Sequence, residues 1–316
     1  MSLAFVFPGQ GSQSVGMLAE LGATEPVVRH TFAEASDVLG YDLWALCQQG
    51  PEAELGSTER TQPAMLAAGV ATWRVWLAKG GPRPVAMAGH SLGEYSALVC
   101  SEALDFRSAV DLVRYRGQVM QQAVPVGQGA MAAILGLEDA ELETACREAA
   151  QGEVVEAVNF NAPGQIVIAG HASAVQRAIE GAKARGAKRA VMLPVSVPSH
   201  SPLMVGAAEQ LAARLAGVDV RLPNVPAVYT VDVKTHASPD GIRQSLKEQL
   251  YKPVRWADTV RAMIASGCTT FVECGPGKVL TSLNRRIERK PELKMLALDD
   301  GASIAAALAA CAEATP

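Results

Sequence analysis

The pentapeptide Gly89-His90-Ser91-Leu92-Gly93 constrains the fold most, because it stands between an apolar run and a helical one. Residues 84–88 before it are typical of a buried strand, and residues 92–101 after it are typical of a helix. In a strand–turn–helix elbow, the two glycines let strand and helix approach closely, and the serine hydroxyl is held exposed at the carboxyl edge of a sheet. The motif predicts a nucleophilic serine, Ser91; the alternative is a plain βα turn.

Strands and helices alternate up to residue 120, beginning with a strand at residues 3–7, which indicates a parallel sheet with helices on both faces. The middle of the chain follows the order β-α-β-β-α-β, that of the ferredoxin-like split unit. Proline and glycine near residues 125–129 and 194–202 suggest hinges around this inserted unit. Its six elements are expected at residues 130–135, 139–150, 154–158, 165–169, 172–186 and 190–195.

Further elements of the larger unit are expected after the insert. Apolar periodicity predicts two more strands and several helices in this part of the chain. The strands are expected at residues 227–230 and 270–272, and the helices at 207–215, 242–249, 260–266 and after Gly277.

The composition is that of a folded protein with a large core. The 316 residues exceed one typical domain of about 150. Hydrophobic residues make up 49% and charged residues 19%, which excludes a disordered or coiled-coil chain. The net charge of −4, from 28 basic and 32 acidic residues, gives no overall field for nucleic acid or anionic lipid. We therefore expect neither partner, and an acidic partner would need a local basic patch.

Cysteine usage indicates a cytoplasmic protein. The six cysteines are scattered, with no CxxC pair and no Cys/His cluster, which favours free thiols in a reducing compartment and no metal site. The apolar start breaks at Pro8, so it is not a signal peptide. No stretch has the roughly 20 apolar residues that a membrane helix needs. The absence of heptads favours a monomer.

A serine nucleophile needs a base, and five histidines compete for that role. His30 and His236 lie in polar segments and are expected to be solvated. His171 follows a strand as a turn or helix-start residue, and His90 adjoins the serine, where its side chain would shape the elbow. The fifth, His200, lies in a stiff proline-bounded loop.

The order of Ser91 before His200 matches the α/β-hydrolase arrangement, but the residues alone leave the choice of base open. No acidic residue stands in an obvious triad position between the two. Either the fold hides the acid, or a backbone or amide carbonyl orients the histidine.

The chain resembles the malonyl-CoA:acyl-carrier-protein transacylases, which are related to the acyltransferase domains of polyketide synthases. The resemblance runs through nearly the whole chain in the family's order. It rests on residues 5–13 (FVFPGQGSQ), 89–95 (GHSLGEY), 114–117 (RYRG), 159–165 (NFNAPGQ), 197–200 (VPSH), 249–256 (QLYKPVRW) and 273–278 (ECGPGK).

The resemblance implies an α/β-hydrolase-like core over residues 1–126 and 195–316, with a ferredoxin-like subdomain over residues 127–194. It also implies a Ser–His dyad in place of a triad. His200 would be the base, the position of Gln249 would supply the oxygen that accepts from its ring, and Gln10 and Leu92 would supply the N–H groups of the oxyanion hole. Without the resemblance, residues 9–11 would be a generic turn or a truncated GxGxxG motif, since position 14 is not a glycine.

The resemblance also assigns the substrate and places Arg116 in the pocket. The malonyl group of malonyl-CoA carries a free carboxylate that is costly to bury unpaired, and a guanidinium can bind it bidentately. From the sequence alone, Arg114 and Arg116 would both be solvated on a charged helix. No permanently bound cofactor and no metal is implied.

The implied partner is an acyl carrier protein, which is acidic in this family. Two basic runs could bind it: Lys188 and Arg189 at the end of residues 183–189, and Arg285 and Arg286 near the end of the chain. Solvated helix ends are the alternative for each run.

The implied activity is malonyl transfer from coenzyme A to the phosphopantetheine thiol of the carrier, through a malonyl-serine ester, for fatty-acid synthesis. Three alternatives remain open. They are a trans-acting acyltransferase of a polyketide synthase, a serine thioesterase or hydrolase, and a non-catalytic carrier-docking module.

Overall fold

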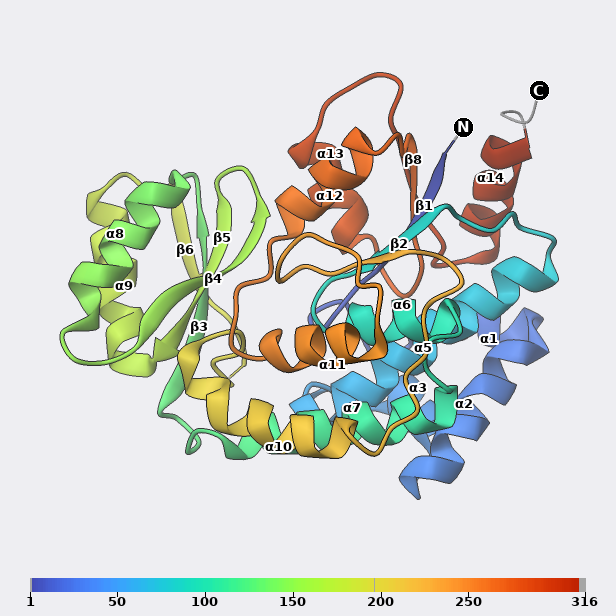
Figure 1. Cartoon of the computed structure of the whole chain (residues 1–316), viewed down its shortest axis with the longest axis horizontal. Coiled ribbons are helices and arrows are strands. Elements are labelled where there is room, and N and C mark those ends of the chain that lie inside the picture. The colour runs from blue at the N-terminus through green and yellow to red at the C-terminus, as the bar shows by residue number, and fades with distance from the viewer. Residues whose placement is uncertain (1, 196, 313–316) are drawn as a thin grey trace.

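The computed structural model describes residues 2–195 and 197–312, and within them the strands form two separate sheets (Figure 1). The larger sheet is parallel, in the order β7-β2-β1-β8-β9, and the smaller is antiparallel, in the order β4-β5-β3-β6. The predicted α/β class with a parallel sheet is confirmed. The strands span β1 Leu3–Phe7, β2 Ala86–Gly89, β3 Gly129–Leu135, β4 Val155–Ala162, β5 Gln165–His171, β6 Arg189–Met192, β7 Ala227–Val228, β8 Thr270–Glu273 and β9 Lys294–Ala297.

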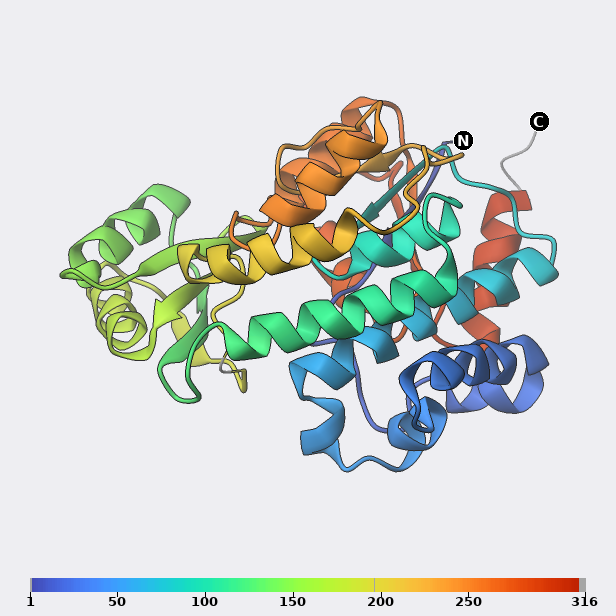
Figure 2. The ribbon, with the colours of Figure 1, turned by 60° about the horizontal axis from the view of Figure 1, so that its bottom comes forward.

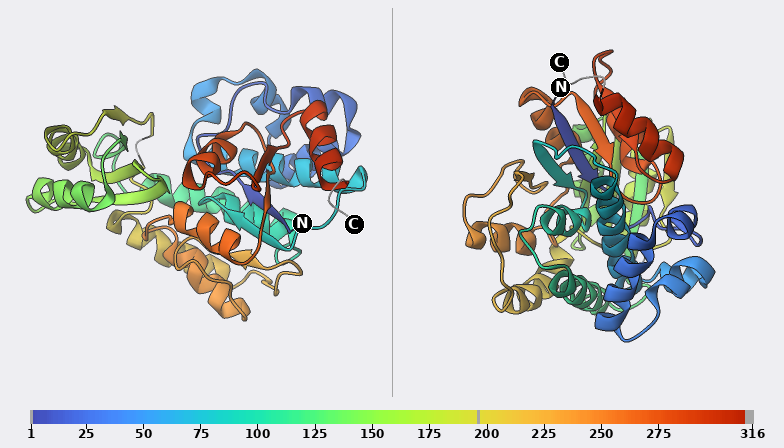
Figure 3. Two further views of the ribbon diagram at one scale, coloured as in Figure 1. Left: turned by 90° about the horizontal axis from the view of Figure 1, so that it is seen from above. Right: turned by 90° about the vertical axis from the view of Figure 1, so that its right-hand side faces the viewer.

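Helices cover both faces of the parallel sheet (Figure 3). Successive side chains of a strand point to opposite faces, and every residue of β1 is buried. Phe5 and Phe7 pack into one apolar cluster with α2 (Pro26–Leu39) and α5 (Thr58–Ala78). Ala4 and Val6 pack into a second cluster with α12 (Trp256–Ala265) and α13 (Val279–Ile287). A continuous apolar strand is what a parallel sheet buried on both faces requires.

The strands expected at residues 3–7 and 84–88 correspond to β1 and β2, and the segment between them contains helices that the sequence did not predict. Residues 19–78, all described by the structure, form only helices: α1 Ala19–Thr24, α2, α3 Leu43–Gln49, α4 Glu52–Leu55 and α5. Helix α5 is buried almost all round, so it lacks the polar face by which an amphipathic helix is recognised in a sequence.

The middle of the chain has the predicted order β3-α8-β4-β5-α9-β6, with α8 at Asp139–Ala150 and α9 at Ala172–Ala184. Both helices pack on one face of the antiparallel sheet through an apolar cluster separate from those of the larger sheet. Figure 1 shows this unit, in green, to one side of the larger sheet. The hinge predicted at residues 194–202 includes residue 196, which lies outside the described residues, as do residues 1 and 313–316 of the predicted core.

Two helices lie where the chain passes between the larger unit and the β3–β6 unit. Helix α7 (Phe106–Gln122) ends shortly before β3, and α10 (Val205–Leu215) begins shortly after the chain returns from β6. They pack against each other, and Figure 2 shows them side by side, pointing towards the small sheet. The other helices in the described ranges are α6 Gly93–Cys100, the short 3-10 helix η1 Pro202–Met204, α11 Pro239–Glu248 and α14 Gly301–Ala312. Within the described ranges, no helix combines the length and apolarity needed to cross a membrane.

The end of the chain contains two elements that the sequence did not predict. Strand β9 is a short edge strand that starts with a lysine, and α14 follows it. The predicted elements from α10 to α13 are present, with boundaries shifted by a few residues.

Candidate active site

The elbow predicted at Gly89–Gly93 joins β2 to α6, and its glycines allow a close approach of the backbone. A Cβ atom on Gly89 would lie 1.9 Å from the Gly93 carbonyl carbon, and one on Gly93 would lie 2.0 Å from the Phe7 oxygen. Ser91 has a left-handed backbone with φ of 52°. Such a conformation costs on the order of 1–3 kcal/mol and persists only where the surroundings enforce it.

Three neighbouring parallel strands bring polar residues to the same edge of the sheet. Gln10 follows β1, Ser91 follows β2 and Thr230 follows β7. Strands β7, β2 and β1 are adjacent and parallel, so their carboxyl ends meet. Ligands of open α/β sheets bind at this edge.

The structure brings Ser91, His200 and Gln249 together. The Ser91 Oγ lies 2.8 Å from His200 Nε2, and His200 Nδ1 lies 2.6 Å from the main-chain oxygen of Gln249. Because a carbonyl oxygen only accepts, Nδ1 carries the proton and Nε2 is the acceptor for the serine hydroxyl. Within residues 2–195 and 197–312, no carboxylate contacts the histidine ring. The orienting group is a backbone carbonyl, one of the two possibilities left open by the sequence.

His200 is held as a neutral imidazole. Burial, and secondly the charge of Arg116, lower the pKa of His200 to about 3. Its backbone is also left-handed, with φ of 65°, and its N–H donates to the Leu250 oxygen. A histidine that is neutral at pH 7 is ready to accept a proton.

Arg116 extends from α7 to the serine and is almost fully buried, with 1% of its surface exposed. Its Nη1 donates to Gln62 Oε1 at 2.7 Å, and its Nη2 donates to Gln249 Oε1 at 2.9 Å and to Ser91 Oγ at 3.3 Å. Its Nε–H is buried without an acceptor in the described part of the chain. A buried guanidinium held by neutral amides can receive an anionic group.

Glu94 is a buried neighbour of this site that its sequence pattern does not distinguish. It lies in the first turn of α6, and burial raises its pKa to about 7. Its Oε2 accepts from Gln249 Nε2 at 2.6 Å, while its Oε1 accepts from Thr230 N and Oγ1. The only signal in the sequence was its place in GHSLGEY, three residues after the serine.

The N–H groups of Gln10 and Leu92 lie in neighbouring turns. A Cβ atom on Gly9 would lie 2.5 Å from the His90 oxygen and 3.7 Å from the Leu92 nitrogen, so the turn after β1 presses against the elbow. In the described ranges, neither N–H donates to a protein acceptor. Leu92 also precedes the first residue of α6, where the helix dipole favours negative charge.

Comparison with known proteins decides the family. Residues 4–298 match the acyl transferase domain family. The chain belongs to the acyl transferase family. It is 58% identical over 305 residues to the malonyl CoA-acyl carrier protein transacylase of Escherichia coli strain K12, covering 96% of this chain and 98% of the relative. The resemblance drawn from the seven sequence segments is confirmed.

Solved structures of malonyl transacylases have the same fold as this chain. The malonyl CoA-acyl carrier protein transacylase of Coxiella burnetii matches with a TM-score of 0.96 at 52% identity, covering 98% of this chain and 97% of the other. A malonyl-transacylase in complex with a type II PKS acyl-carrier protein also matches with a TM-score of 0.96, at 56% identity, covering 98% of this chain and 100% of the other.

The remaining histidines of this acyl transferase family member lie apart from the Ser91 hydroxyl. His90 Nε2 donates to Asn161 Oδ1 at 2.8 Å, which ties the elbow to β4, as its expected shaping role requires. His171 precedes α9, and its Nδ1 accepts from the Val154 N–H. His30 is exposed, as predicted. His236 was expected to be solvated, which is wrong, because its ring packs on Tyr229 and is only 21% exposed.

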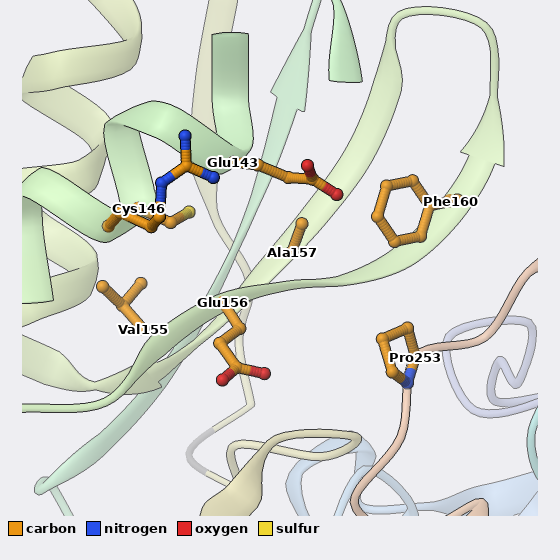
Figure 4. A pocket seen from close by; sticks show the side chains of 8 residues that line it. Glu143, Cys146, Val155, Glu156, Ala157, Phe160 and Pro253 are labelled. Atoms are coloured by element: carbon orange, nitrogen blue, oxygen red, sulfur yellow. The ribbon is translucent and has the colours of Figure 1, made fainter. Parts of the chain in front are cut away.

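A separate pocket lies between α8, β4 and Pro253 (Figure 4). Its lining includes Glu143 and Glu156 against a single cation, Arg147, and none of the site residues described above. Figure 4 shows the Glu143 carboxylate pointing towards the Phe160 ring. A lining with more acidic than basic groups repels anions, so this pocket does not suit the phosphates of coenzyme A.

Proposed function

We propose that this protein transfers a malonyl group from coenzyme A to the phosphopantetheine thiol of an acyl carrier protein, through an ester on Ser91. The observation that carries the proposal is the position of the Ser91 hydroxyl. It lies between a neutral base, His200 Nε2, at 2.8 Å and a buried cation, Arg116 Nη2, at 3.3 Å. The base serves acyl transfer in general, and the cation fits an acyl group that carries a carboxylate.

In the first half-reaction, His200 Nε2 takes the hydroxyl proton as Ser91 Oγ attacks the thioester carbonyl. The unpaired N–H groups of Gln10 and Leu92 support an assignment as oxyanion hole. The Gln249 carbonyl holds the ring and favours the imidazolium that forms. When the intermediate collapses, the carbon–sulfur bond breaks, and the thiol of coenzyme A leaves with the proton from His200.

In the second half-reaction the carrier's thiol enters the same space. His200 takes its proton, the sulfur attacks the malonyl-serine carbonyl, and Ser91 Oγ leaves and recovers the proton. The first half converts a thioester into a serine ester, and the second converts that ester back into a thioester, so neither needs an external energy source. Arg116 would hold the malonyl carboxylate throughout, and its buried, unpaired Nε–H offers a further donor.

We propose that the carrier binds at one end of the antiparallel sheet. There Leu135 of β3 pairs with Gln165 of β5 on one side and with Arg189 of β6 on the other. Gln165 Oε1 accepts from Arg286 Nη1 at 2.6 Å, and Lys188 precedes Arg189. These contacts place the two predicted basic runs beside each other, where they would form one basic face for an acidic partner.

This basic face is connected to the elbow through Asn161. Asn161, which contacts His90 beside Ser91, is only four residues from Gln165, so at most about 14 Å of extended backbone separates them. Lys188, Arg189 and Arg286 are exposed. Arg285 donates to the Met295 oxygen at 3.0 Å, so we assign it a smaller share of the binding.

We further propose that residues 1–126 and 195–316 form an α/β-hydrolase-like core and that residues 127–194 form a ferredoxin-like subdomain. The strand order β4-β5-β3-β6 and the sequence β-α-β-β-α-β support the second assignment. We also propose a cytoplasmic monomer without a resident cofactor, membrane or nucleic-acid partner. The six buried, unpaired cysteines support the cytoplasmic location, and the net charge of −4 supports the absence of a nucleic-acid or anionic-membrane partner.

Intact-protein mass spectrometry after mixing with malonyl-CoA tests the proposed function. We expect one added malonyl group on wild type, which disappears when a carrier protein bearing phosphopantetheine is added, and none on Ser91→Ala. An adduct lost to water before the carrier is added would favour a serine thioesterase. Failure of wild type to form any adduct would favour a docking module and overturn the proposal.

The pathway depends on the carrier that is used. The likeness to a malonyl-transacylase bound to a type II PKS carrier favours a polyketide carrier as a second candidate beside fatty-acid synthesis. Rates with one fatty-acid carrier and one polyketide carrier, measured on the same malonyl-enzyme, decide between the two roles.

A further inference from the structure

A directional chain of hydrogen bonds connects Glu94 to Arg116. The Gln249 side chain links them, since its Nε2 donates to Glu94 Oε2 at 2.6 Å and its Oε1 accepts from Arg116 Nη2 at 2.9 Å. The same Nε2 donates to the Ser91 main-chain oxygen at 2.8 Å. An amide has one acceptor and one donor end, so the arrangement works in only one orientation.

Glu94 favours that orientation because both of its oxygens serve as acceptors in the structure. Three donors converge on its two oxygens: the Thr230 N–H, the Thr230 hydroxyl and the Gln249 amide, at 2.8, 2.7 and 2.6 Å. The Glu94 side chain is buried, with 2% of its surface exposed. Turning the Gln249 amide over would set two acceptors against each other at Glu94 and two donors against each other at Arg116.

The turn that supplies Thr230 is itself strained. Val233 has φ of 59°, which is a rare conformation for a β-branched residue. The turn is closed by hydrogen bonds from the Val233 N–H to the Tyr229 oxygen and from the Tyr229 N–H to the Lys234 oxygen. The fold therefore enforces an unfavourable backbone beside the residue that anchors Glu94.

No carboxylate within the described ranges lies in salt-bridge contact with Arg116, whose partners are two neutral amides and the serine hydroxyl. A glutamate in direct contact would compete with an incoming carboxylate for the guanidinium. With an amide between them, Glu94 can fix the position of Arg116 without occupying its binding edge.

We propose that Glu94 is a positioning residue which, through the Gln249 amide, sets the place of Arg116 and so the preference for acyl groups that carry a carboxylate. This inference rests on the proposed function. It assigns Glu94 no contact with the substrate, and it predicts an effect on malonyl transfer that is larger than the effect on transfer of an uncharged acyl group.

Glu94→Gln tests the inference directly. A glutamine has one acceptor oxygen, so it must set its NH₂ group against either the Thr230 N–H or the Gln249 amide. We measure the rate of Ser91 acylation by malonyl-CoA and by acetyl-CoA. The ratio of the malonyl rate to the acetyl rate should fall about tenfold or more, as expected for a lost hydrogen bond to a charged group.

Glu273→Gln is the matched control. Glu273 is also buried and accepts two backbone N–H groups, from Leu280 and Thr281, at the start of α13. This substitution should lower stability and leave the malonyl-to-acetyl ratio unchanged. Thr230→Val, which removes one donor to Glu94 but keeps the backbone N–H, should lower the ratio by less than Glu94→Gln, and it carries the test if Glu94→Gln does not fold.

The outcomes separate this inference from the proposed function. Equal losses for malonyl and acetyl groups would give Glu94 a purely structural role and overturn the inference. A rise in the ratio would mean that Glu94 acts only by repelling the substrate's carboxylate, which also overturns it. A wild-type protein that forms no malonyl adduct would instead overturn the proposed function itself.

Discussion

The Nη2 atom of Arg116 lies 3.3 Å from the hydroxyl oxygen of Ser91. In a malonyl ester formed on that oxygen, a single methylene group separates the carboxylate from the ester carbonyl. The guanidinium is therefore within reach of the acyl group before and after coenzyme A leaves. Substrate choice and nucleophilic attack are set at one place, by residues from α7 and from the elbow.

Arg116→Ala should lower kcat/KM for malonyl-CoA about 10- to 100-fold more than for acetyl-CoA, because a carboxylate buried without its charged partner loses on the order of 1.5–3 kcal/mol. Initial rates with the two donors measure this. Arg114→Ala is the control, since Arg114 lies on the same helix and pairs with Asp111 at 2.6 Å. Equal losses for both donors in Arg116→Ala would remove Arg116 from the specificity role.

The rate of Ser91 acylation should not fall near pH 6.5, the ordinary pKa of a histidine. Burial, and secondly Arg116, lower the pKa of His200 from 6.5 to about 3, so the imidazole stays neutral well below pH 6.5. The acid limb for acetyl-CoA should lie far below pH 6.5 and move upward in Arg116→Ala. A fall in the wild-type rate centred at pH 6.5 would contradict this prediction.

The lowered pKa of His200 also affects folding stability. Between pH 6.5 and about 3 the unfolded chain binds more protons than the folded protein, so stability falls as the pH drops through that range.

Charge reversal on the small sheet should weaken binding of the carrier protein without changing acylation by malonyl-CoA. Lys188→Glu with Arg189→Glu should raise KM for the carrier protein about tenfold or more by replacing attraction with repulsion, while the rate of Ser91 acylation by malonyl-CoA stays within about twofold. Steady-state kinetics against carrier concentration and the adduct assay measure the two effects.

The control for charge reversal is Arg107→Glu with Arg221→Glu, which changes the net charge equally. Arg107 lies in the first turn of α7, at the end away from β3, and the Arg221 N–H donates to the Ala103 oxygen near the same end. Both side chains are exposed. If this pair raised the carrier KM as much, or if the first pair left it unchanged, the proposed docking face would be wrong.

Gly93→Ala should destabilise the protein by about 1–3 kcal/mol, since the new methyl group would lie 2.0 Å from the Phe7 oxygen and force β1 and α6 apart. Gly206→Ala in α10 is the matched change, because nothing lies within 4 Å of its Cβ position. It should stabilise by about 0.5–1 kcal/mol. Chemical denaturation of both variants checks the contrast, and a stable Gly93→Ala would refute the close-approach explanation.

The sequence predicted those parts of the fold that have local signals. The apolar run at β1, the elbow and the whole β3–β6 unit were found because each combines an apolar run or a periodic pattern with glycine or proline at its ends. Helix α5 and strand β9 were missed for opposite reasons. The first is apolar on nearly every side, and the second is a short edge strand whose partner, β8, lies more than twenty residues earlier.

The site residues also differ in whether they have a local signal in the sequence. Ser91 was predicted from its own neighbours, whereas His200, Gln249 and Arg116 needed a family resemblance, because the sequence does not show that a helix at residue 116 and a loop at residue 200 both reach Ser91. Glu94 was missed because its position in the first turn of a helix suggests an ordinary favourable charge. The role that we propose for Glu94 in positioning Gln249 follows only from its burial and from its hydrogen bonds with Gln249 and Thr230.

The six buried cysteines have a consequence for a protein that we propose handles two thiols and their esters. All six lie in the described ranges and are free: Cys47, Cys100, Cys146, Cys268, Cys274 and Cys311. Burial raises the pKa of Cys47 and Cys146 to about 12, so neither is a thiolate at neutral pH. Thiol–thioester and thiol–disulfide exchange both require a thiolate with access to its target. The enzyme can thus meet coenzyme A and phosphopantetheine repeatedly without being acylated or disulfide-linked through its own sulfur atoms.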